Sequence, residues 1–181
     1  MEAPEVPTEQ LHEEMEHHAH SGPRWITGVA LSCAILATFA AVASLRAGHH
    51  ESEAMMCQIQ AANAWSYFQS KSIKESQLKS KMDIFAALDK TVSPADLKKA
   101  EEYVSDKDKI QKEAEAKETE SRHELKAHKT FAESVTFFQI SIAMGAIAAL
   151  TKRKPFWLVS LGIGVIGLIF FVQAFLLASA Q

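Results

Sequence analysis

Histidine and glutamate residues gather in two short groups in the first third of the chain. The first group lies close to the N-terminus and contains His17, His18 and His20 with Glu13, Glu14 and Glu16. The second group is His49, His50, Glu51 and Glu53. Imidazole and carboxylate side chains are ligands for zinc, nickel and copper, so both groups are candidate metal sites.

Neither group is a complete metal site by itself. In a helical second group, only His49 and Glu53 stand four residues apart on one face. A metal site of His49, His50 and Glu53 therefore requires an oligomer that multiplies these ligands around an axis. The alternative interpretations are a solvated acidic tail for the first group and polar residues at a membrane surface for the second.

Catalytic chemistry is not indicated elsewhere. The sequence shows no nucleophile–base pair, no phosphate-binding loop and no full set of metal ligands. The two cysteines, Cys33 and Cys57, are poorly placed to pair with each other and suggest no zinc site. We therefore expect a protein that is not an enzyme and needs no cofactor.

Three segments of the chain contain no charged residue: 25–45, 134–150 and 155–181. The first histidine group precedes the first of these segments, and the second group follows it. A helix needs about 20 apolar residues to cross a hydrocarbon core about 30 Å thick. The rest of the chain holds too little apolar material to enclose three uncharged helices in a soluble core. The sequence predicts transmembrane helices at 24–46, 131–151 and 155–179.

A long charged segment, 47–130, separates the first two spans. Few helix-breaking residues interrupt it, so we expect the first span to continue outward as one helix to about Lys90. A turn is predicted near 91–95, with Ser93 as the N-cap, Pro94 as the first helical residue and Asp96 as a capping-box acid. The predicted fold class is an all-α membrane protein with three transmembrane helices and a long extramembrane antiparallel helical hairpin, which resembles a coiled coil.

The shortest loop indicates the orientation. Thr151-Lys152-Arg153-Lys154 joins the second and third spans, and short basic loops stay cytoplasmic. With three spans, the acidic tail 1–23 is then also cytoplasmic, and the hairpin 47–130 lies on the opposite side. Trp25 and Trp157 fall at the same membrane interface in this arrangement.

Polar residues inside the spans are few. Gln139, Gln173 and Thr38 are expected at a similar depth, where they would form hydrogen bonds between helices or line a pore. No charged residue lies at mid-depth, which argues against a pump or coupled transporter.

Three stretches of the sequence carry a family resemblance: Val29-Ala30-Leu31-Ser32, Gly48-His49-His50-Glu51-Ser52-Glu53-Ala54 and Trp65-Ser66-Tyr67-Phe68-Gln69-Ser70-Lys71-Ser72-Ile73-Lys74. The chain resembles the bacterial family catalogued as domain of unknown function 4337 over nearly its whole length. One mild departure is Phe68, where a second tyrosine is expected. The resemblance implies a protein of the bacterial inner membrane and no established activity. Together with the orientation given by the basic loop, this location places the hairpin of the multi-pass protein in the periplasm.

The most specific of these stretches also has a physical interpretation. Trp65 and Phe68 lie on one helix face, and Tyr67 and Lys71 lie on an adjacent one. This aromatic cluster is either part of the hairpin core or an interaction surface for a partner.

The second arm of the hairpin offers little apolar surface for the first to pack on. Between Ser105 and Lys129, Ile110 and Leu125 are the only aliphatic residues larger than alanine. Because so thin a seam is marginal for an isolated pair of helices, we expect a homo-oligomer or a larger membrane protein complex. The hairpin's charges are nearly balanced, so the hairpin has no basic stripe of the kind that binds nucleic acid, and we expect no nucleic-acid partner. The other expected partner is the lipid bilayer, which the three spans cross.

The sequence therefore favours a non-enzymatic structural or accessory membrane protein. The alternatives are an oligomeric channel, with Gln139, Gln173 or Thr38 in the pore, and a metal-binding sensor or carrier that uses the second histidine group.

Overall fold

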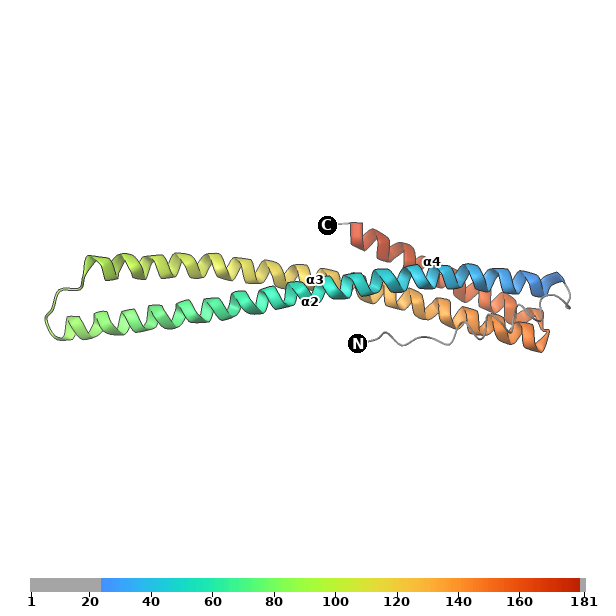
Figure 1. The fold of residues 1–181 in the computed structure, drawn as a ribbon, viewed down its shortest axis with the longest axis horizontal. Coiled ribbons are helices and arrows are strands. Elements are labelled where there is room, and N and C mark those ends of the chain that lie inside the picture. The colour runs from blue at the N-terminus through green and yellow to red at the C-terminus, as the bar shows by residue number, and fades with distance from the viewer. Residues whose placement is uncertain (1–23, 180–181) are drawn as a thin grey trace. The chain divides into compact units, whose positions relative to one another are not determined.

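The computed structural model describes residues 24–179, and these residues form three α-helices and no β-strand (Figure 1). The helices are α2 (Arg24–Ala87), α3 (Pro94–Thr151) and α4 (Lys154–Ser179). Each contains a stretch that is long and apolar enough to cross a membrane, which supports a multi-pass membrane protein. The predicted all-helical class is confirmed. The acidic tail 1–23 lies outside the described residues.

The connection between α2 and α3 follows local capping rules. α2 ends at Ala87, three residues before the predicted Lys90, because Asp89 adopts the left-handed conformation (φ 53°) and the backbone N–H of Lys90 donates back to Phe85 at 2.9 Å. At the start of α3, the Ser93 hydroxyl accepts a hydrogen bond from the backbone N–H of Ala95 at 3.3 Å. Ser93 and Pro94 therefore take their predicted places.

The connection between α3 and α4 is shorter than expected. It consists of Lys152 and Arg153, since Thr151 and Lys154 belong to the helices. Lys152 is left-handed (φ 55°), and the N–H of Arg153 donates to the carbonyl of Ala148 at 3.3 Å. This tight turn holds two basic residues between two apolar helices.

The chain divides into two compact units, Ser52–Leu125 and the remainder. We call Ser52–Leu125 the arm unit. The span unit comprises the described residues up to Glu51 together with those from Lys126 onward. α2 and α3 contribute to both units, and α4 lies within the span unit.

In the span unit, small residues and phenylalanines fill the space between the helices. One buried cluster contains Val29, Cys33, Ile142 and Ala146, and another contains Ala43, Ala47, Phe131 and Ala174. Gly145 and Gly167 mark the closest approaches: a Cβ on Gly145 would lie 2.5 Å from Cys33 Sγ, and one on Gly167 would lie 2.9 Å from the Phe138 ring. Close helix packing through small residues is typical of membrane proteins.

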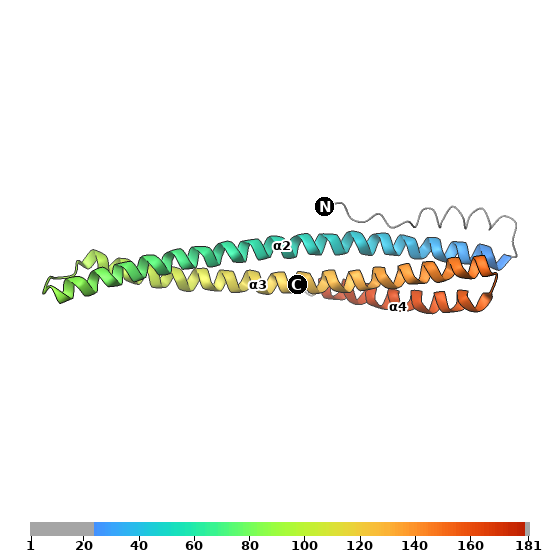
Figure 2. The ribbon, with the colours of Figure 1, turned by 90° about the horizontal axis from the view of Figure 1, so that it is seen from below.

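In the arm unit, residues 52–87 of α2 run beside residues 94–125 of α3 in both views (Figures 1 and 2). We call these segments the α2 arm and the α3 arm. Ala54, Cys57 and Ala61 are buried on the first, and Ile110 and Ala114 on the second. The spacing of three and four residues is that of a coiled-coil seam. Because alanine dominates this seam, the two helices approach closely without bulky aliphatic side chains.

Candidate functional site

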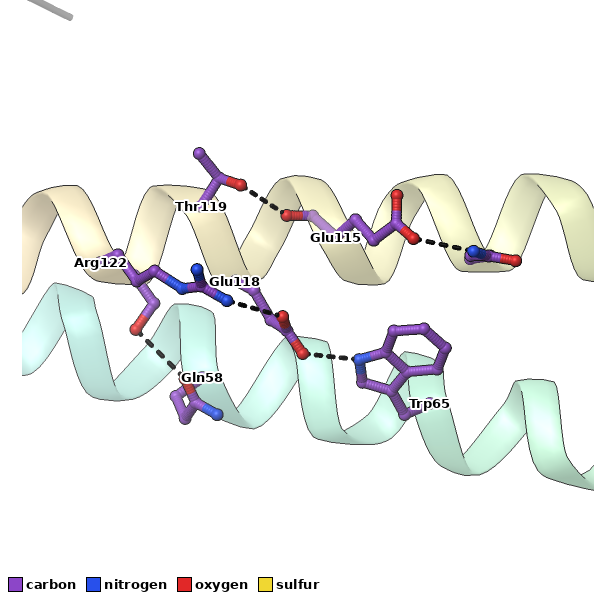
Figure 3. Close-up of polar contacts among 8 residues, drawn as sticks. Gln58, Trp65, Glu115, Glu118, Thr119 and Arg122 are labelled. Carbon is purple, nitrogen blue, oxygen red and sulfur yellow. Dashed lines mark hydrogen bonds and ion pairs between the residues drawn. The ribbon is translucent and has the colours of Figure 1, made fainter.

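The seam of the arm unit is completed by polar contacts that the sequence did not reveal. The indole N–H of Trp65 donates to Glu118 Oε1 at 2.7 Å, and the other oxygen of Glu118 faces the Arg122 guanidinium at 3.3 Å (Figure 3). The Ser121 hydroxyl donates to the backbone carbonyl of Ala54 at 2.9 Å. A charged acceptor strengthens such a bond, so Glu118 fixes the position of the Trp65 ring.

Farther along the arms, ion pairs replace apolar contacts. Lys71 Nζ lies 2.7 Å from Asp106 Oδ2, and Lys107 Nζ lies 2.7 Å from Glu75 Oε2. The hydrogen bond between the first pair raises the pKa of Lys71 and lowers the pKa of Asp106. The ammonium of Lys107 also lies 5.3 Å from the centre of the Phe68 ring.

The four residues of the predicted interaction surface have different surroundings. Trp65, Phe68 and Lys71 are half-buried and contact other residues of the arm unit. Lys71 lies over the rings of both Tyr67 and Tyr103, at 5.4 and 5.3 Å. Tyr67 itself is 52% exposed. The structure therefore gives all four residues contacts within the arms and leaves Tyr67 as the most accessible of them.

A different face of the α2 arm is exposed, and the sequence indicated it only through the excess of apolar side chains on this arm, such as Met55 and Met56. We define the outer face as the α2 residues opposite the seam: Met55, Met56, Ile59, Ala62, Asn63, Ser66, Gln69, Ser70, Ile73, Ser76, Gln77 and Ser80. None of these residues is charged. Met55, Met56, Ile59 and Ile73 are each more than half exposed, at 60%, 54%, 59% and 58%.

The corresponding outward positions of the α3 arm are different in character. They are exposed and mostly charged: Glu101, Glu102, Ser105, Asp108, Lys109, Lys112, Glu115, Ala116, Thr119 and Arg122. This is the composition expected of a solvated helix face. The signal for the outer face was available in the sequence as the uncharged stretch 54–70, but it becomes informative only once the seam is located.

Comparison with known proteins assigns the chain to a family. A family model described as a domain of unknown function, DUF4337, matches residues 25–177. The chain belongs to this family. No curated protein and no solved structure matches the chain. The DUF4337 assignment covers all three helices and confirms the predicted family.

In this DUF4337 protein the two histidines of the second group have neighbouring rings, 5.5 Å apart, but they differ in exposure. His50 is buried, with its ring stacked on Phe131 at 5.5 Å, whereas His49 is exposed. Glu53 belongs to the arm unit. Among residues 24–179, no three His, Cys, Asp or Glu side chains are placed to hold a metal ion. Metal binding shared between copies stays a prediction, and the first histidine group lies outside the described residues.

The hydrogen bonds between α3 and α4 of the DUF4337 protein involve residues other than those predicted. Ser141 Oγ donates to the carbonyl of Ser160 at 2.6 Å, and Ser160 Oγ donates to the carbonyl of Ser141 at 2.7 Å. Both serines are fully buried. Thr38 instead donates to Ala34 of its own helix at 3.0 Å. This difference arises because serine is small enough to reach a neighbouring backbone carbonyl.

The two glutamines predicted inside the spans occupy different environments. Gln173 is exposed on α4, and Gln139 is half-buried on α3. Within the span unit, the paired serines therefore make the hydrogen bonds between helices that we expected of these amides.

The two cysteines are buried and free of disulfides within the described residues. For Cys57 in the arm unit, burial raises the pKa of the thiol, and the nearby Glu120 carboxylate raises it further. A protonated, buried thiol is a poor nucleophile, so Cys57 acts as a small seam residue.

Proposed function

We propose that this protein is a non-enzymatic structural or accessory protein of the bacterial inner membrane. It self-associates or joins a larger membrane complex through its spans and its hairpin. In this proposal the N-terminus is cytoplasmic, the spans hold the chain in the bilayer, and the hairpin 47–130 projects into the periplasm.

The exposed, uncharged outer face of the α2 arm is the observation that carries the proposal. A helix face that stays in water normally presents charged side chains, as the α3 arm does. Met55, Met56 and Ile59 instead leave large apolar side chains in solvent. Contiguous apolar surface rimmed by polar residues is typical of an interaction site.

The polar seam supports the same interpretation. Lys71, Asp106, Lys107 and Glu75 pair within the arm unit, so these charges stabilise the arms and are not displayed to a partner. The outer face carries none of these charges and is the part of the α2 arm that we propose binds a partner.

The channel alternative finds less support in the arrangement of side chains. Phe39, Phe138 and Phe171 contact one another inside the span unit. A single copy therefore has an apolar interior, and a pore would have to form between copies.

The test is the mass of the complex extracted into detergent and into nanodiscs, with co-purifying proteins identified in the same sample. A discrete homo-oligomer, or stoichiometric recovery of another membrane protein, is the expected result. A monomer without any companion in both media would refute the proposal.

A further inference from the structure

We infer that the outer face of the α2 arm binds the outer face of a second copy of the same chain, with the two arms parallel and in register. The inference deepens the proposed function, because it rests on the membrane anchor and names the partner. The interface consists of the residues of the outer face, from Met55 to Ser80, on each copy.

The shared bilayer determines the geometry of such a contact. Two copies with the same orientation have their first spans at the same depth, and α2 is one continuous helix from Arg24 to Ala87. Equal residues of two α2 arms are therefore the same number of residues along the helix from the first span. When the same faces meet, each residue lies next to its own counterpart, as in a parallel coiled coil.

Contact between identical faces in register has a strict electrostatic condition. Any charged residue on the face would meet the same charge on the other copy, and like charges at such positions are destabilising. The outer face of the α2 arm satisfies the condition, since none of its members is charged. The outward face of the α3 arm does not, because Glu101 would meet Glu101 and Lys112 would meet Lys112.

The composition of the face also suits a second copy more than an unrelated protein. A different partner would be free to use complementary charges for specificity, and this face offers none. Ala62, Ser66 and Ser70 are small enough for two helices to approach closely, while Met55 and Ile59 supply the apolar contact. Asn63 and Gln69 carry amides that both donate and accept, so each can bond to its own counterpart.

The size of the face explains why the anchor matters. From Met55 to Ser80 the helix rises about 37 Å, and a strip about 10 Å wide gives about 400 Å² on each copy. The total of about 800 Å² lies below the roughly 1,200 Å² of a stable soluble complex. Confinement to one bilayer raises the effective concentration of the second copy and compensates for the small area.

Cysteine cross-linking of the full chain in its membrane tests the contact directly. Ile59→Cys lies on the outer face near its Met55 end, and Thr119→Cys provides a matched control on the outward face of the α3 arm, where Thr119 is also exposed. The native Cys33 and Cys57 are buried and serve as the background. With copper phenanthroline we expect at least tenfold more disulfide-linked dimer for Ile59→Cys than for Thr119→Cys. Equal cross-linking of the two variants would overturn the inference.

Charge insertion separates this inference from the proposed function. Ile59→Glu should reduce the oligomeric fraction at least tenfold in nanodiscs, whereas Thr119→Glu should leave it unchanged, with helicity checked by circular dichroism. If both variants remain oligomeric, copies associate through another surface, and the inference fails while the proposed function stands. If the native chain is a monomer bound to another protein, the inference also fails. If the native chain is a monomer without any companion protein, both the inference and the proposed function fail.

Discussion

Gly145 on α3 is where the packing of the span unit is most sensitive to one added methyl group. A Cβ at this position would lie 2.5 Å from Cys33 Sγ on α2, which is closer than real Cβ contacts permit. The same Cβ would also lie 3.4 Å from Ser160 Oγ on α4. Gly145→Ala must therefore push α2 and α3 apart or displace the buried Cys33 side chain.

The magnitude follows from a comparison with Gly162 on α4, which has no atom within 4 Å of its would-be Cβ. Both Gly→Ala changes gain about 1 kcal/mol of helix propensity. Overpacking of a buried site costs about 1–3 kcal/mol. We therefore expect Gly145→Ala to be about 1–3 kcal/mol less stable than Gly162→Ala, and Gly162→Ala to be at least as stable as the native chain.

Cys33→Ala provides the internal check. It removes the sulfur that the new methyl meets, at a cost of about 1 kcal/mol for one buried group of that size. The double variant should be about 1–3 kcal/mol more stable than the sum of the single changes. The assay is unfolding in mixed micelles by increasing the mole fraction of sodium dodecyl sulfate, followed by circular dichroism. Additive effects, or equal stability of Gly145→Ala and Gly162→Ala, would refute the reasoning.

Three further predictions use the same unfolding assay. Ser141→Ala removes the hydroxyl that bonds to Ser160 and should cost about 1 kcal/mol, whereas Ser160→Ala in the Ser141→Ala background should cost less than it does alone. Trp65→Phe removes an indole donor bonded to a carboxylate of the α3 arm and should lower the stability by about 1–3 kcal/mol; an unchanged midpoint would contradict this. Asp106→Asn should destabilise the arm unit at neutral pH. Because Lys71 lowers the pKa of Asp106, the difference from the native chain should shrink as the pH falls from about 4 through the lowered pKa of Asp106, and a difference that does not shrink on acidification would contradict the assignment.

The helices and their ends were largely predictable because they depend on local chemistry. Three uncharged segments indicate three helices that can cross a membrane, and all three are present. Ser93 and Pro94 mark the start of α3 because their preferences hold in almost any context. The end of α2 was less predictable, since the left-handed residue is Asp89 and no glycine marks the place.

The contacts between helices were harder to predict because they depend on which faces meet. Gln139 and Gln173 are conspicuous polar residues in the sequence, yet the hydrogen bonds between α3 and α4 come from Ser141 and Ser160. Serines are common in such segments, and only close approach of α3 and α4 makes this pair different. The partner of Trp65 was equally hidden, because Glu118 is one of many glutamates in the α3 arm.

The thin seam of the arms requires a revised explanation. The scarcity of aliphatic residues in the α3 arm suggested that the arms need a partner to become stable. In the structure, alanines such as Ala61 and Ala114 let the helices meet closely, and pairs such as Lys71–Asp106 replace bulky apolar contacts. The seam therefore gives no reason to expect a partner. The argument for a partner rests instead on the outer face, where Met55 and Ile59 remain in solvent. A substitution that weakens the seam and one that charges the outer face should then have separable effects, the first on unfolding of the arms and the second on association of copies.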